Sequence, residues 1–479
     1  MKRLLLVLSL ISLTVCSSYS QPDTLWTRTI GGTNNDGCRS IYPTSDGGFI
    51  LGGFTKSFAT VEDDMFLVKI NAQGVPAWQQ AYHINLWDGA NSVQQTGDGG
   101  YVLAGYCGSN PNYDFAIVKT DAAGVLQWSK SYGGSNEDRA YGVRQTVDGG
   151  YIVAGTAKSF TGYEDIWLLK LNSAGDTTWT KLFSSSETDY GYGVIITSDG
   201  GYLIVGSTKG WGASNRDALL LKTDASGNQL WLHLFSGLRD EYGYGVTSTS
   251  DGGYILIGDT RTQFSSDVDV YIAKTDEAGI QQWTHNYNYD VWDVGNSISE
   301  VPEGGYYAAT SVGNNINKDF QILKIDGSGN ELWHQAFGSA SVNDEAKDIL
   351  TTDDGGCLAA GITNSFGAGM TDIYLVRMGT GAGTLPGNIP MPLSFRLLES
   401  YPNPFNNQTV VSFELPAAGS IKLTVCDISG RENAIIAEGW FPPGFHSLAW
   451  NAKNANSGIY FITLEYGGVK QTRKVALVK

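Results

Sequence analysis

Aspartates at two fixed places in a repeated sequence unit are the residues best suited to chemistry. The unit, described below, has four segments. One set of aspartates precedes the third segment of each unit: Asp64, Asp114, Asp165, Asp217, Asp269, Asp319 and Asp372. The other set precedes the first segment: Asp36, Asp88, Asp138, Asp189, Asp240, Asp293 and Asp344. Carboxylates gathered on one face would offer the oxygen ligands that Ca²⁺ takes. The alternative is that each Asp caps its own loop by accepting backbone N–H bonds. Because no compact D-x-D-x-D loop favours a metal, we assign no metal ligand and no cofactor, and calcium stays an open alternative.

Large aromatic residues at places where the units differ are the candidate ligand-binding residues. In five units the loop between the second and third segments carries a large aromatic: Phe58, Phe160, Trp211, Phe264 and Phe366. Two other loops insert a Trp directly before an Asp, namely Trp87 and Trp292. Exposed aromatics beside carboxylates suit stacking on sugar faces or a protein hot spot. Aromatics that merely cover neighbouring loops would give the same pattern. The predicted ligand-binding residues are Trp87, Trp211, Trp292, Phe160 and Phe264.

The sequence offers little support for catalysis. His233 and His285 each stand two residues after a repeated Trp, where sister units carry Arg, Gln or Lys, so we interpret the position as a polar strand edge. HExxH, GxSxG, P-loop and dinucleotide-binding glycine patterns are missing. An acidic pair for glycoside hydrolysis stays open, but nothing marks out one pair. We therefore predict no catalytic residue.

The elements that must position these residues come from seven copies of one unit. A Trp recurs every 50 to 52 residues, at Trp26, Trp78, Trp128, Trp179, Trp231, Trp283 and Trp333. Each unit also has an Asp-Gly-Gly turn, in which Glu replaces Asp in one copy. These turns begin at Asp46, Asp98, Asp148, Asp199, Asp251, Glu303 and Asp354. The turn is followed by an apolar run ending in a small residue, and then by alternating residues ending in Lys or Arg. Each unit thus predicts four short β-strands joined by glycine turns.

Four-stranded units of about 50 residues, repeated seven times, are typical of a seven-bladed β-propeller. The chain opens on a lone fourth strand, residues 24–30, and the seventh unit stops after its third strand at Met378. We expect the N-terminal strand to close the last blade, which removes exposed sheet edges. Residues 21–378 also resemble the repeats of secreted bacterial seven-bladed β-propeller proteins.

Composition divides the chain into two parts. Residues 21–378 carry 21 Lys and Arg against 42 Asp and Glu, whereas residues 392–479 carry eight against six. An acidic body argues against nucleic acid as a partner, because phosphates require clustered cations. The cysteines that follow the N-terminal segment are scattered without a CxxC pair, so we interpret them as buried thiols.

The N-terminus has the order of a secretory signal peptide. Lys2 and Arg3 precede an apolar run over residues 4–15, and small residues follow up to Ser20. The run is too short to span a bilayer permanently. We predict a signal peptide over residues 1–20 and no transmembrane segment after its cleavage.

The C-terminal part is predicted to be a separate all-β module. A Gly/Pro-rich linker without charge covers residues 379–391. Alternating segments at 410–415, 421–426 and 459–464, separated by glycine turns, predict a small antiparallel sandwich over residues 392–479.

Five sequence motifs follow one another in this module: YPNPF, ISGR, GFH, SGIYF and a basic C-terminal stretch. They contain Tyr401, Pro402, Asn403, Pro404, Phe405, Gly430, Gly444, Gly458, Tyr460, Lys474 and Lys479. In their order and spacing they resemble the type A sorting domain of the type IX (Por) secretion system, an Ig-like fold of the FlgD type. His446 belongs to the shared Gly-x-His pattern and is interpreted as a fold residue. The resemblance implies the type IX secretion machinery as a partner, and a secreted or outer-surface location.

The sequence therefore predicts a secreted or cell-surface β-propeller, exported through its C-terminal domain, that binds an extracellular glycan or protein without catalysis. Two alternatives stay open. One is an extracellular glycosidase or lyase that uses carboxylates near the propeller axis, and the other is a passive structural surface repeat protein.

Overall fold

The computed structural model describes residues 23–59, 62–237, 239–261, 267–314, 316–339, 342–380, 395–398, 400, 403–416, 419–441, 444–453 and 455–479. Within these ranges the chain is all-β, and no helix is present that could cross a membrane. The predicted signal peptide and most of the predicted linker lie outside the described residues.

Six antiparallel four-stranded sheets follow one another along the chain, and each is a meander of consecutive strands. We call them blades 1 to 6. Blade 1 comprises β2 (Asp36–Pro43), β3 (Phe49–Thr55), β4 (Asp64–Ile70) and β5 (Pro76–Tyr82), and blade 2 comprises β6 (Trp87–Gln95), β7 (Tyr101–Ser109), β8 (Asn112–Thr120) and β9 (Leu126–Tyr132). Blade 3 comprises β10 (Asp138–Gln145), β11 (Tyr151–Ala157), β12 (Asp165–Leu171) and β13 (Thr177–Phe183), and blade 4 comprises β14 (Asp189–Ile196), β15 (Tyr202–Thr208), β16 (Asp217–Thr223) and β17 (Gln229–Phe235). Blade 5 comprises β18 (Asp240–Ser248), β19 (Tyr254–Arg261), β20 (Val268–Thr275) and β21 (Gln281–Tyr287), and blade 6 comprises β22 (Val294–Glu300), β23 (Tyr306–Gly313), β24 (Lys318–Ile325) and β25 (Glu331–Phe337).

The last repeated sheet combines the two ends of the repeat region. Blade 7 consists of β26 (Asp344–Thr351), β27 (Cys357–Thr363), β28 (Asp372–Met378) and the N-terminal β1 (Thr24–Gly31). β1 pairs antiparallel with β28, with Ile30 opposite Ile373 and Thr27 opposite Val376. The predicted pairing of the N-terminal strand with the last unit is therefore confirmed.

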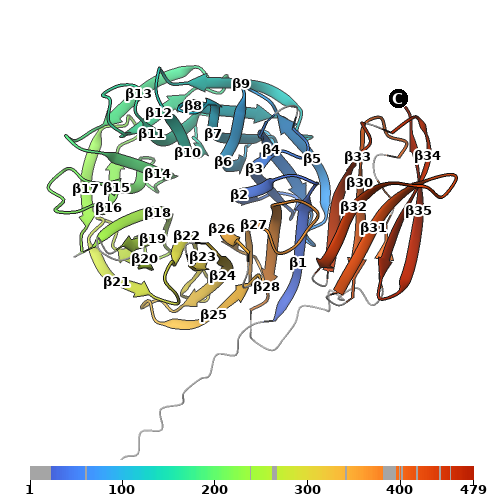
Figure 1. Cartoon of the computed structure of the whole chain (residues 1–479). Coiled ribbons are helices and arrows are strands. Elements are labelled where there is room, and N and C mark those ends of the chain that lie inside the picture. Colours follow the sequence, from blue (N-terminus) through green and yellow to red (C-terminus); the bar gives the residue numbers. More distant parts are fainter. Residues whose placement is uncertain are drawn as a thin grey trace, which may run out of the picture.

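The blades are arranged around a centre, with the first strand of each blade innermost and the Trp-bearing strand outermost (Figure 1). The middle strands are buried on both faces, as in β12, because each blade packs between two neighbours. Seven apolar clusters each join two adjacent blades, and one of them joins β1, β27 and β28 to β2, β3 and β4. The apolar side chains of this region thus serve packing between blades.

The C-terminal module consists of two sheets that enclose one apolar core. One sheet holds β29 (Arg396–Leu397), β30 (Gln408–Leu415) and β33 (Gly444–Asn451), and the other holds β31 (Gly419–Asp427), β32 (Glu432–Phe441), β34 (Gly458–Tyr466) and β35 (Val469–Leu477). Phe413, Leu423, Trp450 and Ile462 lie in the core between them. This matches the predicted small antiparallel sandwich.

An unpredicted pairing joins the module to blade 7. β33 pairs in parallel with β1, from Thr27 opposite Gly444 to Gly31 opposite Leu448, and the module lies beside this blade in Figure 1. Its cover explains why six of the eight residues of β1 are buried, whereas the outer strand β9 of blade 2 alternates between exposed and half-buried residues.

Candidate binding site at the ring axis

One residue of each innermost strand is displaced from the strand pairing by a β-bulge. In β10, Ala140 and Gly142 pair with consecutive residues of β11, so Tyr141 is left out of the ladder. The same shift recurs in every blade, and the displaced residues are Arg39, Asn91, Tyr141, Tyr192, Tyr244, Asn296 and Lys347. Bulges redirect side chains and are frequent beside functional sites.

The bulge explains the glycine that ends the second-strand run in six blades, whereas blade 6 has Thr310 at this place. A Cβ at Gly155 would lie 2.1 Å from the backbone oxygen of Arg139, and a Cβ at Gly258 would lie 1.7 Å from that of Tyr242. These separations are far inside van der Waals contact, so the close approach of the bulged strand requires glycine.

All seven bulge residues line one cavity of about 150 Å³ between the innermost strands of the blades, which we call the axial cavity. Three of them are tyrosines in edge-to-face contact: the ring centroids are 5.4 Å apart for Tyr141 and Tyr192, and 5.1 Å apart for Tyr192 and Tyr244. All three side chains are only half-buried. Part of the surface of each of these residues therefore stays accessible.

Arginines pack on further tyrosines next to this group. Tyr190 stacks on Tyr192 with centroids 5.6 Å apart, and Tyr242 stacks on Tyr244 at 6.0 Å. The Arg216 guanidinium lies 4.8 Å from the Tyr190 ring centroid, and that of Arg261 lies 4.2 Å from the Tyr242 centroid. Such contacts combine a cation with an aromatic face.

The same pattern continues in blades 2 and 3. Arg139 lies 4.5 Å from the Tyr106 ring centroid and 4.3 Å from the Tyr113 centroid. Glu137 forms an ion pair with Arg139 at 2.6 Å, and Asp259 forms one with Arg261 at 2.7 Å. The tyrosines and arginines that pack beside the lining residues, which we call the aromatic rim, thus offer aromatic faces and paired charges of both signs.

Asp348 is the single acidic residue among the described residues that line the cavity. It accepts hydrogen bonds from Ser297 Oγ (2.6 Å) and from the backbone N–H groups of Ile41 and Ile349 (2.9 Å each). Burial raises the pKa of Asp348, opposed by these bonds and by the charge of Arg144. Its oxygens are therefore engaged by protein donors.

The aromatics predicted to bind ligand fall into two groups. Phe160 packs edge-on against Trp167 with centroids 5.0 Å apart, and Trp211 packs against the core between blades 3 and 4. Both residues thus pack against apolar residues of the blades, although Phe160 is 51% exposed. Phe264 lies outside the described residues.

Trp87 and Trp292 have different surroundings. Both are half-buried, and each has a lysine near its ring: Lys56 Nζ is 5.6 Å from the Trp87 centroid, and Lys318 Nζ is 5.7 Å from the Trp292 centroid. Arg261 lies 5.6 Å from the Trp292 centroid and also packs on Tyr242. The structure thus connects Trp292 to the aromatic rim of the axial cavity.

The acids at the start of the innermost strands act as loop caps. Asp138 accepts bonds from the backbone N–H groups of Gly134 (3.0 Å), Lys158 (2.9 Å) and Ser159 (3.1 Å), and from Ser159 Oγ (2.6 Å). This is the capping that we considered beside calcium as a role for these acids. In blade 5 the sequence placed Asp240 in this role, but Glu241 takes it by accepting from Gly237 N and Thr260 Oγ1.

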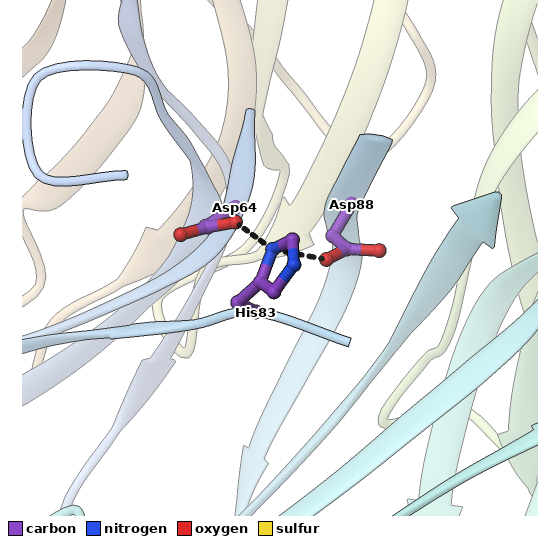
Figure 2. Close-up of side chains that lie close together, drawn as sticks. All are labelled: Asp64, His83 and Asp88. Atoms are coloured by element: carbon purple, nitrogen blue, oxygen red, sulfur yellow. Dashed lines mark hydrogen bonds and ion pairs between the residues drawn. The ribbon is translucent and has the colours of Figure 1, made fainter. Parts of the chain in front are cut away.

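The acids at the start of the third strands face those caps across each blade junction. A Cβ at Gly133 would lie 2.1 Å from Asp114 Oδ1 and 2.7 Å from Asp138 Oδ2, so the two carboxylates approach the same point. At the junction of blades 1 and 2 the corresponding residue is His83, whose ring lies between Asp64 and Asp88 (Figure 2).

The recurring cations and histidines have structural partners. In blades 1 to 5 the Lys of the third strand pairs with the turn Asp, as Lys170 does with Asp148 at 2.8 Å. His233 and His285 contact backbone oxygens of the following blade, those of Ala278 (3.1 Å) and Ser328 (3.0 Å). Cys38, Cys107 and Cys357 are free and buried, as predicted, and Cys426 is half-buried.

The predicted sorting-domain residues are distributed over the C-terminal module. The Asn403 side chain bonds the backbone of Lys474 and Ala476, Phe405 and Tyr460 are buried, and Lys479 Nζ donates to Lys453 O at 2.6 Å. Gly430 lies just before β32, Gly444 begins β33, and Gly458 begins β34. Pro404 directly precedes Phe405. Tyr401 and Pro402 lie outside the described residues.

His446 has a contact that the sequence did not predict. It is fully buried, its ring contacts Phe413 and Phe441, and its Nδ1 lies 2.9 Å from Thr29 Oγ1 of β1. The residue thus belongs to the fold, as predicted, and also to the boundary with blade 7.

Sequence reasoning did not identify the bulge residues. A signal was present: each stands three residues after the acid that caps the preceding loop, and its type varies around the repeat, with Tyr in blades 3 to 5, Asn in blades 2 and 6, Arg in blade 1 and Lys in blade 7. A change of residue type at a fixed place in a repeat is the pattern expected of a binding surface.

Comparison with known protein families identifies the C-terminal part of the chain. Residues 399–478 match the family described as the secretion system C-terminal sorting domain. No curated protein matches the chain.

Three solved structures show similar arrangements of strands. PorZ of Porphyromonas gingivalis, described as an essential bacterial surface component of the type-IX secretion system, is 11% identical with a TM-score of 0.44, and the match covers 94% of this chain and 60% of PorZ. The Pan2 WD40 domain of Neurospora crassa is 10% identical with a TM-score of 0.48, and 77% of this chain and 97% of that domain are covered. An ulvan lyase, a polysaccharide lyase, is 9% identical with a TM-score of 0.48, covering 74% and 96%.

This chain thus spans 60% of the length of PorZ, and TM-scores below 0.5 support no conclusion on activity. The sorting domain, in contrast, is matched over residues 399–478, which contain the motifs identified in the sequence. The chain carries a type IX C-terminal sorting domain at residues 399–478, and the protein is secreted or lies on the outer cell surface.

Proposed function

We propose that this protein is an exported glycan-binding β-propeller whose ligand binds at the axial cavity. The proposal includes a closed ring of seven blades, an Ig-like fold for the C-terminal sandwich, and a signal peptide at residues 1–20. The pairing of β1 with β28 and the apolar cluster between blades 7 and 1 support the closed ring.

The observation that carries the proposal is the group of half-exposed tyrosines displaced by bulges toward one cavity. Tyrosine presents an apolar ring and a polar tip, which suits a sugar ring with one apolar face and several hydroxyl groups. Asn91, Asn296 and Ser297 line the same cavity as neutral polar groups, and hydrogen bonds to the protein hold them in place. A few placed polar groups among aromatic faces are typical of small-ligand sites.

The cavity favours binding over hydrolysis. Glycoside hydrolysis commonly uses two carboxylates that flank the scissile bond. Among the described lining residues only Asp348 is acidic, and it accepts three hydrogen bonds from the protein. The lining therefore does not offer a free carboxylate pair.

A binding screen tests the proposal directly. The full chain is applied to an array of bacterial, algal and host glycans and, in parallel, to an array of extracellular matrix proteins. We expect retention of a defined glycan class without release of reducing ends or unsaturated products. Binding to proteins alone, or turnover of a polysaccharide, would replace the proposal by one of its alternatives.

Export is tested separately. Deleting residues 392–479 is expected to leave the protein in the periplasm, because the outer-membrane step requires the sorting domain. Immunoblots of periplasm, cell surface and medium from a type IX-competent host provide the measurement. Unchanged appearance of the truncated protein outside the cell would refute this route.

A further inference from the structure

One blade junction combines an imidazole with two carboxylates. Asp64 is the first residue of β4, His83 follows β5, and Asp88 lies in β6, so the three side chains come from blades 1 and 2 and the loop between them. His83 Nδ1 lies 2.8 Å from Asp64 Oδ1 and 3.7 Å from Asp88 Oδ2. Figure 2 shows the ring between the two carboxylates.

These separations suit a shared metal ion. The ligand atoms of the three residues all lie within 4.8 Å of one another. Ligands at about 2.0–2.1 Å around a tetrahedral zinc ion are roughly 3.3 Å apart. The two observed nitrogen–oxygen distances lie on either side of that value, so small side-chain movements would bring all three ligands to one ion.

The surroundings hold the ligands in place and leave room for water. Asp88 Oδ2 accepts from the backbone N–H groups of Ile84 (2.7 Å) and Asn85 (3.0 Å), which belong to the same loop as His83. Hydrogen bonds of this kind orient metal-binding carboxylates. Asp64 and Asp88 are buried, whereas the His83 side chain is 42% exposed, so water could complete the coordination.

The other blade junctions show that the fold does not require the histidine. The residues at the place of His83 are Gly31, Gly133, Ser184, Ser236, Asn288 and Gly338. Ser236 donates to Asp217 at 2.7 Å and Asn288 donates to Asp269 at 2.6 Å, so neutral donors satisfy the acid there. Among the seven junctions, His83 alone adds a nitrogen ligand to the carboxylate pair.

We propose that Asp64, His83 and Asp88 bind a divalent transition-metal ion, Zn²⁺ by preference, that links blades 1 and 2. One imidazole nitrogen with two carboxylate oxygens is a donor set for zinc and its neighbours, whereas Ca²⁺ takes oxygen ligands only. The site is distinct from the axial cavity, because none of its three residues lines that cavity.

The test compares the full chain with two glycine variants after treatment with EDTA. Isothermal titration with ZnCl₂ is expected to give one equivalent, and Co²⁺ is expected to give visible absorption bands of a low-coordinate site. His83→Gly installs the residue of three sister junctions and should weaken Zn²⁺ binding at least a hundredfold. His334→Gly removes a histidine that pairs with Glu331 at 2.7 Å outside any carboxylate pair, and should leave binding unchanged.

Melting curves establish that both variants fold, since added Zn²⁺ should raise the melting temperature of the parent chain and of His334→Gly. His83→Gly should melt as a folded protein without that increase. Equal Zn²⁺ affinity in the parent chain and His83→Gly, or an absence of binding in the parent chain, would overturn the proposal.

Discussion

The two faces of the repeated region place their aspartates in opposite electrostatic settings. On the face of the Asp-Gly-Gly turns, each Asp has a cation within its own blade, as Asp148 has Lys170 at 2.8 Å. On the opposite face, each innermost-strand acid is buried against a second acid and is satisfied by backbone and hydroxyl donors, as Asp138 is.

The pKa values follow this division. Hydrogen bonds from Lys170 and Thr146 lower the pKa of Asp148 to about 2. Burial raises the pKa of Asp293 to about 6, opposed by backbone N–H bonds. Ionised Asp148 on the turn face therefore stabilises the fold, whereas ionised Asp293 on the opposite face costs stability. The face opposite the Asp-Gly-Gly turns is therefore the better candidate for a functional site, because the residue beside its paired acids differs from one blade junction to the next.

The largest expected effect comes from removing a carboxylate on the turn face. Asp148→Asn would leave the buried Lys170 ammonium without its counter-charge, and should lower the free energy of unfolding by about 2 kcal/mol. Urea denaturation of the full chain provides the measurement. Asp176→Asn is the matched control, because its ion pair with Lys130 is exposed, and it should have no measurable effect. Equal effects of the two substitutions would contradict the assigned role of the turn acids.

Much of the fold was predictable because its signals are local. Glycine turns, the intervals between tryptophans and the unpaired first strand predicted four-stranded units and the pairing of β1 with β28. The pairing of β1 with β33 was not predictable, since the two strands lie more than 400 residues apart and no local pattern specifies an edge contact.

The candidate site was predicted only in part. The sequence indicated Trp292, which the structure connects to the axial rim, but a bulge has no signature in a single unit. The structure was needed to identify the bulge tyrosines as candidate binding residues, because the strand register places them around one cavity. They are Tyr141, Tyr192 and Tyr244. Glu241 was missed because Asp240, one position earlier, fits the repeat better.

A pH profile distinguishes the two faces by sign. Burial raises the pKa of Asp293 to about 6 and that of Glu241 to about 7, so the folded state binds these protons first and stability should rise as the pH falls from about 7 to 4. Asp148 has a lowered pKa, so its contribution is lost as the pH falls from about 4 to 2. Calorimetry should therefore show a maximum melting temperature near pH 4 to 5. A steady decrease from pH 7 downward would contradict the division of the faces.

The smallest expected effect comes from the exceptional turn of blade 6. Glu303 stands where other blades carry Asp, and Lys324 lies 4.2 Å from the Tyr307 ring centroid and donates to Gly304 O of the turn (3.5 Å) instead of forming an ion pair with the turn acid. Burial lowers the pKa of Lys324 to about 8. Glu303→Asp should restore the ion pair and stabilise the chain by about 0.5 kcal/mol, measured by urea denaturation. A loss of stability would show that the turn tolerates only glutamate in this blade.

The central claim is that ligand binds at the bulge tyrosines of the axial cavity. The most direct measurement is the affinity of two tyrosine variants for the glycan that the array identifies. Tyr192→Ala should bind at least about tenfold more weakly, because it removes the middle ring of the group. Tyr163→Ala alters an exposed loop tyrosine that does not line the cavity, and its affinity should stay within about twofold of the parent value. Unchanged affinity of Tyr192→Ala, with folding intact, would contradict the account.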